Sequence, residues 1–235
     1  MATVTTQSNP VQQSSKAVRR PRFPLRASER WGIVGKTGSG KSAFARWMLK
    51  RWRKAGWRIL IVDPYLRWSE GFAEKPEEAT LDKPFVLKTP ALIKNSPVML
   101  YRPTLPAYRD EGLNQLMFQA VAEGGVVVCF DEGKSVSTAN FIMPGVGECF
   151  TAGRKSPLPV LFLTQTPKRI HTDILGQCEW IVVFRQNRPQ DRDYMAEWMG
   201  DTRVGGQIPN HAFWLKHEDD DGAQLMQPLP EAEIR

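Results

Sequence analysis

Residues 35–42, with the sequence GKTGSGKS, fit the pattern G-x-x-x-x-G-K-[ST] without a mismatch. Residues 30–34 before them, RWGIV, are typical of a short strand, and residues 42–54 after them carry apolar side chains at helical spacing. A glycine-rich turn in this position can surround a phosphate chain, because glycine permits close approach and the helix N-terminus adds a positive dipole. An ordinary glycine turn with a solvated lysine would not need this context. We therefore expect the chain to fold around a phosphate-binding loop.

This loop predicts binding of a nucleoside triphosphate, ATP, together with Mg²⁺. Its backbone N–H groups would converge on the phosphates, the Lys41 ammonium would contact the transferred phosphoryl group, and the Ser42 hydroxyl would ligate the metal ion. We assign nucleotide binding to every residue of the loop: Gly35, Lys36, Thr37, Gly38, Ser39, Gly40, Lys41 and Ser42.

Apolar runs alternate with helical stretches along the rest of the chain. This alternation predicts an α/β fold, with a mostly parallel sheet that helices cover on both faces. Further strands are expected at residues 58–63, 97–101, 125–130, 159–163, 180–184 and 211–215, and a second helix at residues 114–123. The long connections at residues 64–97 and 132–148 are where we expect functional residues to gather.

Two acids follow the most apolar of these strands. Residues 125–130 lead directly into Asp131 and Glu132, which is the Walker B pattern. In a parallel sheet, residues at the carboxyl end of a strand lie at the same edge as the phosphate loop. We predict that Asp131 holds Mg²⁺ opposite Ser42, and that Glu132 accepts a proton from the water that attacks the γ-phosphate.

A glutamine and an arginine complete the predicted catalytic set. Gln165 follows the next apolar strand. If that strand lies between the strand before the phosphate loop and the strand before Asp131, the Gln165 amide would lie near the γ-phosphate, where it would orient water and sense hydrolysis. Arg154 is our first candidate for an arginine that a neighbouring subunit supplies to the site, with Arg169 and Arg185 as alternatives.

The charge of the chain is unevenly distributed. The 235 residues carry a net charge of +7, which favours an anionic partner, with nucleic acid first. Residues 1–26 hold five basic residues and no acid, so we expect a disordered basic arm. We assign residues 27–215 to the ATPase domain and residues 216–235 to a solvated acidic tail.

Several classes of protein are disfavoured. No stretch approaches the roughly 20 apolar residues of a membrane span, and the N-terminus lacks the apolar region of a secretory signal. Cys129, Cys149 and Cys178 have no metal-ligand spacing, and we expect buried thiols in a reducing compartment.

The order of these motifs resembles the HerA/FtsK superfamily of P-loop ATPases. The segments GIVGKTGSGKS, ILIVDP, VVVCFDEG and GRKSPLPVLFLTQTPKRIHTDILGQCEWIVVFRQN follow one another as in that family. In its short length, the chain is most similar to the genome-packaging ATPases of membrane-containing and double-jelly-roll viruses. Thr166 departs from the pattern, since the family often has arginine there, and Lys168 or Arg169 would have to take over any role of that arginine.

The resemblance implies a RecA-like core that assembles as a ring, usually a hexamer, and drives double-stranded DNA through its centre. Carried over by position, Lys41 and Ser42 belong to Walker A, Asp131 and Glu132 to Walker B, and Gln165 is the sensor. It also implies a location in the host cytoplasm or the virion, and capsid or viral membrane proteins as possible partners. DNA would be held through its phosphates without sequence preference, and Lys134, Arg67 and Lys75 are candidate contacts.

Other functions stay open at this stage. A cellular or plasmid DNA translocase, or a secretion ATPase of the same superfamily, would share these motifs. A P-loop kinase for a small molecule would need lid arginines and an acceptor pocket, but not Glu132 paired with Gln165. A nucleotide-dependent assembly factor without catalysis is disfavoured by the intact set of Lys41, Asp131 and Glu132.

Overall fold

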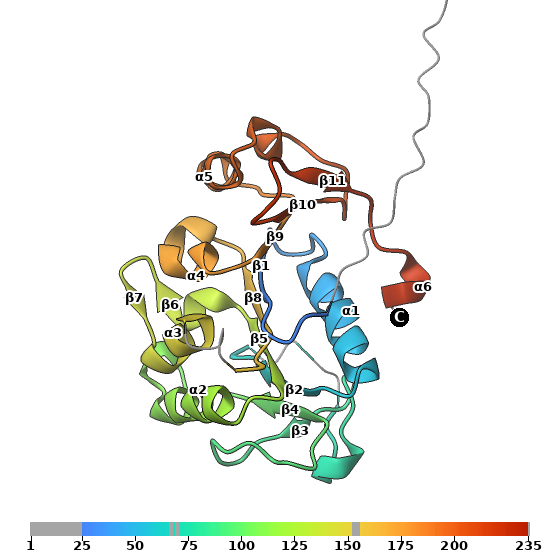
Figure 1. The fold of residues 1–235 in the computed structure, drawn as a ribbon, viewed down its shortest axis with the longest axis vertical. Helices are drawn as coiled ribbons and strands as arrows, with labels where there is room; N and C mark the ends of the chain where they lie inside the picture. Colours follow the sequence, from blue (N-terminus) through green and yellow to red (C-terminus); the bar gives the residue numbers. More distant parts are fainter. Residues whose placement is uncertain (1–24, 66–67, 69–70, 152–155, 235) are drawn as a thin grey trace, which may run out of the picture.

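The computed structural model describes residues 25–65, 68, 71–151 and 156–234. A nine-stranded sheet forms its centre, in the order β11-β10-β9-β1-β8-β5-β2-β4-β3 (Figure 1). The strands are β1 (Arg30–Val34), β2 (Arg58–Val62), β3 (Phe85–Val86), β4 (Val98–Tyr101), β5 (Val126–Asp131), β8 (Val160–Thr164), β9 (Trp180–Phe184), β10 (Phe213–His217) and β11 (Gln224–Met226). All neighbouring strands from β3 to β9 pair in parallel, whereas β10 pairs antiparallel with both β9 and β11. The expected α/β fold with a mostly parallel sheet is confirmed.

Helices cover both faces of this sheet, as predicted (Figure 1). Helix α1 (Lys41–Lys54) lies on one face, where Phe44, Met48 and Trp52 are fully buried. The opposite face is covered by α2 (Glu111–Glu123), α3 (Pro144–Thr151), α4 (Thr172–Gly176) and α5 (Pro189–Met199). Among the described residues, no helix combines the length and the apolar character that crossing a bilayer requires.

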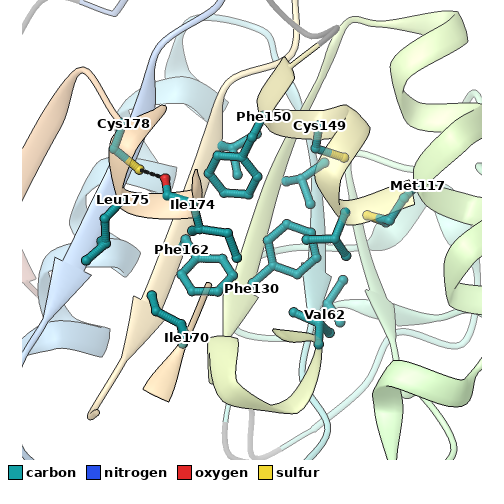
Figure 2. Close-up of a cluster of buried hydrophobic side chains, with 14 of the residues drawn as sticks. Val62, Met117, Phe130, Cys149, Phe150, Phe162, Ile170, Ile174, Leu175 and Cys178 are labelled. Atoms are coloured by element: carbon teal, nitrogen blue, oxygen red, sulfur yellow. Dashed lines mark hydrogen bonds between the residues drawn. The ribbon is translucent and has the colours of Figure 1, made fainter. Parts of the chain in front are cut away.

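The central strands contribute alternate side chains to the two cores. In β8, Val160 and Phe162 face the core under α2–α5, whereas Leu161 and Leu163 face the core under α1. Phe162 packs against Phe130 and Phe150, with ring centroids 5.8 Å and 5.7 Å apart (Figure 2). Because both faces of these strands are covered, they read in the sequence as continuous apolar runs.

The three cysteines are buried, as expected. Cys149 and Cys178 lie in the core beside α3 and α4 (Figure 2). The Cys149 thiol donates to the Gly145 carbonyl within α3, and the Cys178 thiol donates to the Ile174 carbonyl of α4. Burial raises the pKa of the Cys149 thiol to about 12, so this side chain stays protonated and packs as a small apolar group.

The acidic segment at residues 216–235 corrects our expectation of a solvated tail. Strand β10 extends to His217, and β11 pairs with it through Phe213 and Met226. A short helix, α6 (Glu231–Ile234), then lies beside α1 (Figure 1). Four of the acids that suggested a tail, at residues 218–221, occupy the β10–β11 turn, whereas Glu231 and Glu233 lie on α6. Ala223 and Met226 are buried. The acidic turn is thus an exposed connection between two paired strands.

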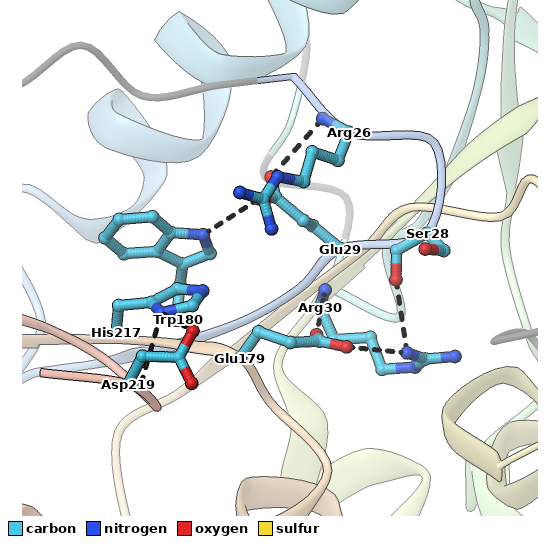
Figure 3. A network of polar contacts seen from close by, with 8 residues as sticks. All are labelled: Arg26, Ser28, Glu29, Arg30, Glu179, Trp180, His217 and Asp219. Atoms are coloured by element: carbon cyan, nitrogen blue, oxygen red, sulfur yellow. Dashed lines mark hydrogen bonds and ion pairs between the residues drawn. The ribbon is translucent and has the colours of Figure 1, made fainter.

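A buried ion pair joins β1 to β9 at the edge opposite the P-loop. The Arg30 side chain is fully buried, and its Nη1 lies 3.0 Å from Glu179 Oε1 and donates to the Ser28 carbonyl (Figure 3). Glu179 Oε2 also accepts the Arg30 backbone N–H at 2.7 Å. Glu29 accepts the Trp180 indole N–H at 3.1 Å, so two acids hold these neighbouring strands in register.

We expect Glu179→Ala to lower the free energy of unfolding by about 3–5 kcal/mol, because it leaves the Arg30 charge buried without its partner. Asp82→Ala is the matched control: Asp82 also pairs with an arginine, Arg46 at 2.6 Å, but its side chain is largely exposed. The control should change stability by less than about 1 kcal/mol. Urea unfolding of the two variants measures this difference, and equal effects would contradict the assignment of Arg30–Glu179 as a structural pair.

Candidate nucleotide-binding and catalytic site

The predicted phosphate-binding loop connects β1 to α1. Two of its backbone amides bond to the neighbouring strands: Gly35 N–H donates to the Thr164 carbonyl at 3.1 Å, and Lys36 N–H donates to the Arg185 carbonyl at 3.0 Å. These bonds tie the start of the loop to the carboxyl ends of β8 and β9. The loop is thus fixed on both sides of β1 before any ligand binds.

Three glycines make the backbone conformation and the close packing of the loop possible. Gly38 and Gly40 adopt positive φ values of 73° and 111°, where a β-carbon is strained. At Gly35 a β-carbon would lie 2.6 Å from both Phe184 Cβ and Ser39 Oγ. Glycine is therefore required at Gly35 for close packing and at the other two for backbone conformation.

Lys41 lies at the start of α1 and is buried. Its Nζ donates to the Lys36 carbonyl at 3.0 Å, so the ammonium bonds to the loop it belongs to. Burial lowers the pKa of Lys41, while the nearby carboxylates of Glu132 and Asp131 oppose this shift. The positive charge is thus held by a carbonyl and by two acids, an arrangement that suits a lysine whose ligand is anionic.

The loop and the ends of β5 and β8 enclose a cavity of about 160 Å³. Its lining brings together seven residues that the sequence assigned to the site, namely Thr37, Gly38, Lys41, Ser42, Asp131, Glu132 and Gln165. Tyr65, Leu163 and Thr164, which the sequence did not single out, complete the lining. They meet because β8 lies between β1 and β5, as expected for Gln165. Ser42 and Asp131, the two predicted Mg²⁺ ligands, both line this cavity, so their placement fits a shared metal ion.

A chain of hydrogen bonds crosses the cavity. The Gln165 amide Nε2 donates to Glu132 Oε2 at 2.8 Å, and Gln165 Oε1 accepts from the Thr37 hydroxyl at 2.8 Å. Gln165 therefore links the predicted base to the phosphate loop. The sequence singled out Gln165 and Glu132, but no sequence signal indicates that Thr37 bonds to the glutamine.

The carboxylate of Glu132 keeps one oxygen unpaired. Glu132 Oε1 is buried and has no hydrogen-bond partner among the described residues. A buried carboxylate oxygen without a partner costs free energy, and a bound water would relieve this cost. The backbone of Glu132 also has a φ of 112°, which is strained for a residue with a β-carbon. The unpartnered oxygen and the strained backbone both support a functional role for Glu132 in this site.

Gly133 makes the position of Glu132 possible. A β-carbon at Gly133 would lie 1.9 Å from Phe162 Cε1, inside the aromatic cluster with Phe130 and Phe150. The Ser135 hydroxyl donates to the Glu132 carbonyl at 2.7 Å and closes the turn η3 (Gly133–Ser135). The glycine in the sequence DEG thus allows the chain to turn sharply against the core.

We expect Gly133→Ala to lower the free energy of unfolding by about 1–3 kcal/mol, because Phe162 has no space to move into. The same change should reduce nucleotide turnover, since it displaces the neighbouring Glu132. Gly147→Ala in α3 is the control: its nearest neighbour would be Ile142 Cγ2 at 3.4 Å, an ordinary contact. Thermal unfolding and steady-state turnover measure both variants, and a Gly133→Ala protein with unchanged stability would contradict the packing argument.

The candidate arginines lie away from this cavity or outside the described chain. Arg154 falls among residues 152–155, which lie outside the described residues. Arg185 Nη1 donates to Asn210 Oδ1 at 3.2 Å. Arg169 is exposed on the turn η5 (Pro167–Arg169). A residue that acts on a neighbouring subunit is not expected to line its own site, so the choice among the three stays a prediction.

A second, larger cavity of about 730 Å³ adjoins the first at Tyr65. Basic and apolar residues share its lining: Tyr65, Leu105, Pro106, Ala107, Tyr108, Lys134, Ser135, Ser137, Thr138, Ala139, Lys168 and Arg169. We call this cavity the basic groove. Of the predicted DNA contacts, Lys134 lies in it, Lys75 pairs with Glu78 on η1 (Pro76–Glu78), and Arg67 lies outside the described residues.

The two turns that supply the basic residues follow the catalytic strands directly. Lys134 is two residues beyond Glu132, and Lys168 is three residues beyond Gln165. The carboxyl ends of β5 and β8 therefore contribute to the first cavity and, one turn later, to the basic groove. The sequence predicted Lys134 as a contact but could not show that residues 105–108 complete the groove.

Comparison with known proteins places this site in a family context. Residues 25–81, which contain the phosphate loop, match the family model described as "Helicase HerA, central domain". No curated protein sequence matches the chain at a significant level.

Solved structures share its fold. The genome packaging NTPase B204 from Sulfolobus turreted icosahedral virus 2, in complex with ATP-gammaS, is similar with a TM-score of 0.71 and 15% identity, over 88% of this chain and 100% of that one. The pCW3 conjugation coupling protein TcpA is similar with a TM-score of 0.60 and 14% identity, over 85% of this chain and 60% of that one. The bacterial conjugative coupling protein TrwB gives a TM-score of 0.61 at 9% identity, over 87% and 85%. At such identities the likeness shows the fold alone. Together with the family model, these matches confirm the resemblance to HerA/FtsK-type P-loop ATPases.

Proposed function

We propose that this chain is an ATP-hydrolysing motor that moves double-stranded DNA, and that it packages a viral genome into a preformed capsid. The observation that carries the proposal is the hydrogen bond from Gln165 to Glu132, directly opposite the phosphate loop. This bond links the Glu132 carboxylate, which can accept a proton, to the Gln165 amide, whose hydrogen bond would respond to that proton transfer. A second oxygen of the same carboxylate, Oε1, is left for water.

The residues divide the hydrolysis of ATP among them. The loop amides and Lys41 bind the phosphates and stabilise the charge that develops on the γ-phosphoryl group. Glu132 accepts a proton from water as the water oxygen bonds to the γ-phosphorus and the bond to the β–γ bridging oxygen breaks, which leaves ADP and phosphate. Mg²⁺ held by Ser42 and Asp131 would neutralise phosphate charge in this site.

The basic groove supports DNA as the partner. Lys134, Lys168 and Arg169 provide three cations on turns that continue from Glu132 and Gln165. Contacts with phosphates need no sequence preference, which suits a motor that must hold any DNA. A change at the γ-phosphate would reach these cations through a few backbone bonds. This short connection favours a motor over a small-molecule kinase, whose acceptor would have to lie within the site.

We infer a homo-oligomeric ring, in which a neighbouring subunit supplies an arginine, because the described residues contribute no arginine side chain to the 160 Å³ cavity. Six subunits is the number that the family resemblance implies. The B204 likeness, which covers 100% of that chain, favours genome packaging, with a virion or host-cytoplasm location and capsid or viral membrane proteins as partners. A plasmid or cellular translocase or a secretion ATPase is the second candidate, because TcpA and TrwB share the fold over 85% and 87% of this chain, with lower TM-scores of 0.60 and 0.61.

We expect Glu132→Gln to lower ATP turnover by about 10²–10⁴-fold while ATP still binds, because the amide cannot accept the proton. Lys41→Ala should abolish turnover and weaken ATP binding. Glu123→Gln, at the exposed end of α2, is the control and should behave as the unchanged protein. Phosphate release and equilibrium binding of ATPγS measure the two properties, and normal turnover in Glu132→Gln would remove Glu132 as the base.

We expect double-stranded DNA of any sequence to stimulate ATP hydrolysis, and rising salt to reduce this effect. The double variant Lys168→Gln/Arg169→Gln should weaken DNA binding and lower the salt dependence by about 2 in log–log slope, one for each lost phosphate contact. Lys88→Gln/Lys94→Gln removes the same charge from exposed loops beside β3 and is the matched control. Equal losses in both double variants would mean that net charge, rather than the basic groove, binds DNA.

A further inference from the structure

Tyr65 lies between the two cavities that the proposed function uses. Among the described residues, it alone lines both the 160 Å³ cavity and the basic groove. In the 160 Å³ cavity it shares the lining with Glu132 and Gln165. In the basic groove it shares the lining with Lys134 and Arg169. One side chain therefore forms part of the wall of two sites with different ligands.

The backbone of Tyr65 is fixed by a buried acid at the end of β2. Asp63 is fully buried, and its backbone N–H donates to the Tyr101 carbonyl at 3.1 Å. Its Oδ1 accepts the Tyr65 N–H at 3.0 Å, and its Oδ2 accepts the N–H of the buried Trp68 at 2.8 Å. Because β2 pairs in parallel with β5, this turn leaves the sheet at the same edge as Asp131.

Residues 105–108, another part of the groove lining, are held by Asp110. The hydroxyl of Thr104 donates to Asp110 Oδ2 at 2.9 Å, and the hydroxyl of Tyr101 donates to Oδ1 at 3.0 Å. The same Oδ1 accepts the Leu113 N–H at 2.7 Å and caps α2. This part of the groove is thus tied to β4 and α2. The Tyr65 side chain, in contrast, is 40% exposed, and side chains with such exposure change rotamer readily.

We propose that Tyr65 couples DNA in the basic groove to the nucleotide in the 160 Å³ cavity. DNA that fills the groove contacts the Tyr65 ring and so sets the wall of the cavity that contains Glu132. A nucleotide in that cavity restricts the same ring from its other side and changes the surface that DNA meets. The inference rests on the proposed function, because it takes ATP and DNA as the ligands of the two cavities.

This coupling can be measured by binding alone. Coupling between two sites is reciprocal, so ATPγS changes the affinity for DNA by the same factor by which DNA changes the affinity for ATPγS. We expect a factor of at least about fivefold in the unchanged protein. Tyr65→Ala removes the shared wall and should bring the factor close to one, whereas Tyr65→Phe keeps the ring and should keep the factor. Fluorescence anisotropy of a labelled DNA duplex of mixed sequence, with and without ATPγS, gives the factor for each protein.

Two further variants serve as controls. Phe72 lies on the same connection between β2 and β3 and is 42% exposed, but it lines neither cavity and packs against the guanidinium of Arg102. Phe72→Ala should therefore change neither the DNA affinity nor the factor. Tyr108 lines the basic groove but not the 160 Å³ cavity, so Tyr108→Ala should weaken DNA binding and leave the factor as it is. This contrast separates a residue that binds DNA from one that couples the two sites.

The outcomes separate this inference from the proposed function. A factor of one in the unchanged protein, an unchanged factor in Tyr65→Ala, or an equal loss in Tyr65→Phe or Phe72→Ala would overturn coupling through the Tyr65 ring. In each of these cases DNA still binds the unchanged protein and stimulates its ATP turnover if the proposed function is right. Failure of the proposed function looks different, because the duplex would then neither bind the unchanged protein nor alter its turnover, and the coupling would fall with it.

Discussion

The parallel pairing of β8 with β1 on one side and with β5 on the other is the constraint on which the site depends. Each of these strands ends in one functional group: the phosphate loop after β1, the acids after β5, and Gln165 after β8. Because parallel strands in register end at a common edge, these groups meet without any long connection. The amide of Gly35 bonds to the carbonyl of Thr164, so the same pairing also holds the loop. The close placement of the phosphate loop, the two acids and Gln165 therefore follows directly from the register of the sheet.

Much of this arrangement could be predicted from the sequence, and the physical reason is burial on both faces. Strands such as β5 and β8 contribute side chains to two cores, so they appear as uninterrupted apolar runs. Short edge strands lack this signal. β11 has three residues with Leu225 exposed, and β3 has two residues of intermediate exposure, so neither stands out from a loop. The same weakness made residues 216–235 look like a tail, because the acids of the turn dominate their composition.

For the site, the sequence predicted which residues meet but not how they bond. The motifs identify Lys41, Glu132 and Gln165 by type and order, whereas the bond between Thr37 and Gln165 depends on side-chain orientation across two strands. The role of Gly133 is visible only in the packing, since the glycine matters because of the position of the Phe162 ring. The basic groove likewise needs residues 105–108 beside the turns after β5 and β8. Contacts between segments distant in the chain leave no local pattern to read.

The buried pair of Arg30 and Glu179 has a consequence for mechanics. It joins β1 and β9 at the end of the strands remote from the phosphate loop, and the Arg30 Nε also donates to the Cys149 carbonyl of α3. At this end β1, which leads into the phosphate loop, is thus bonded to β9 and to α3. The turns η3 and η5 follow β5 and β8 at the other end of the sheet. If loss of the γ-phosphate displaces the turns η3 and η5, as the proposed function requires, the buried ion pair and the bond to α3 would keep β1 in place.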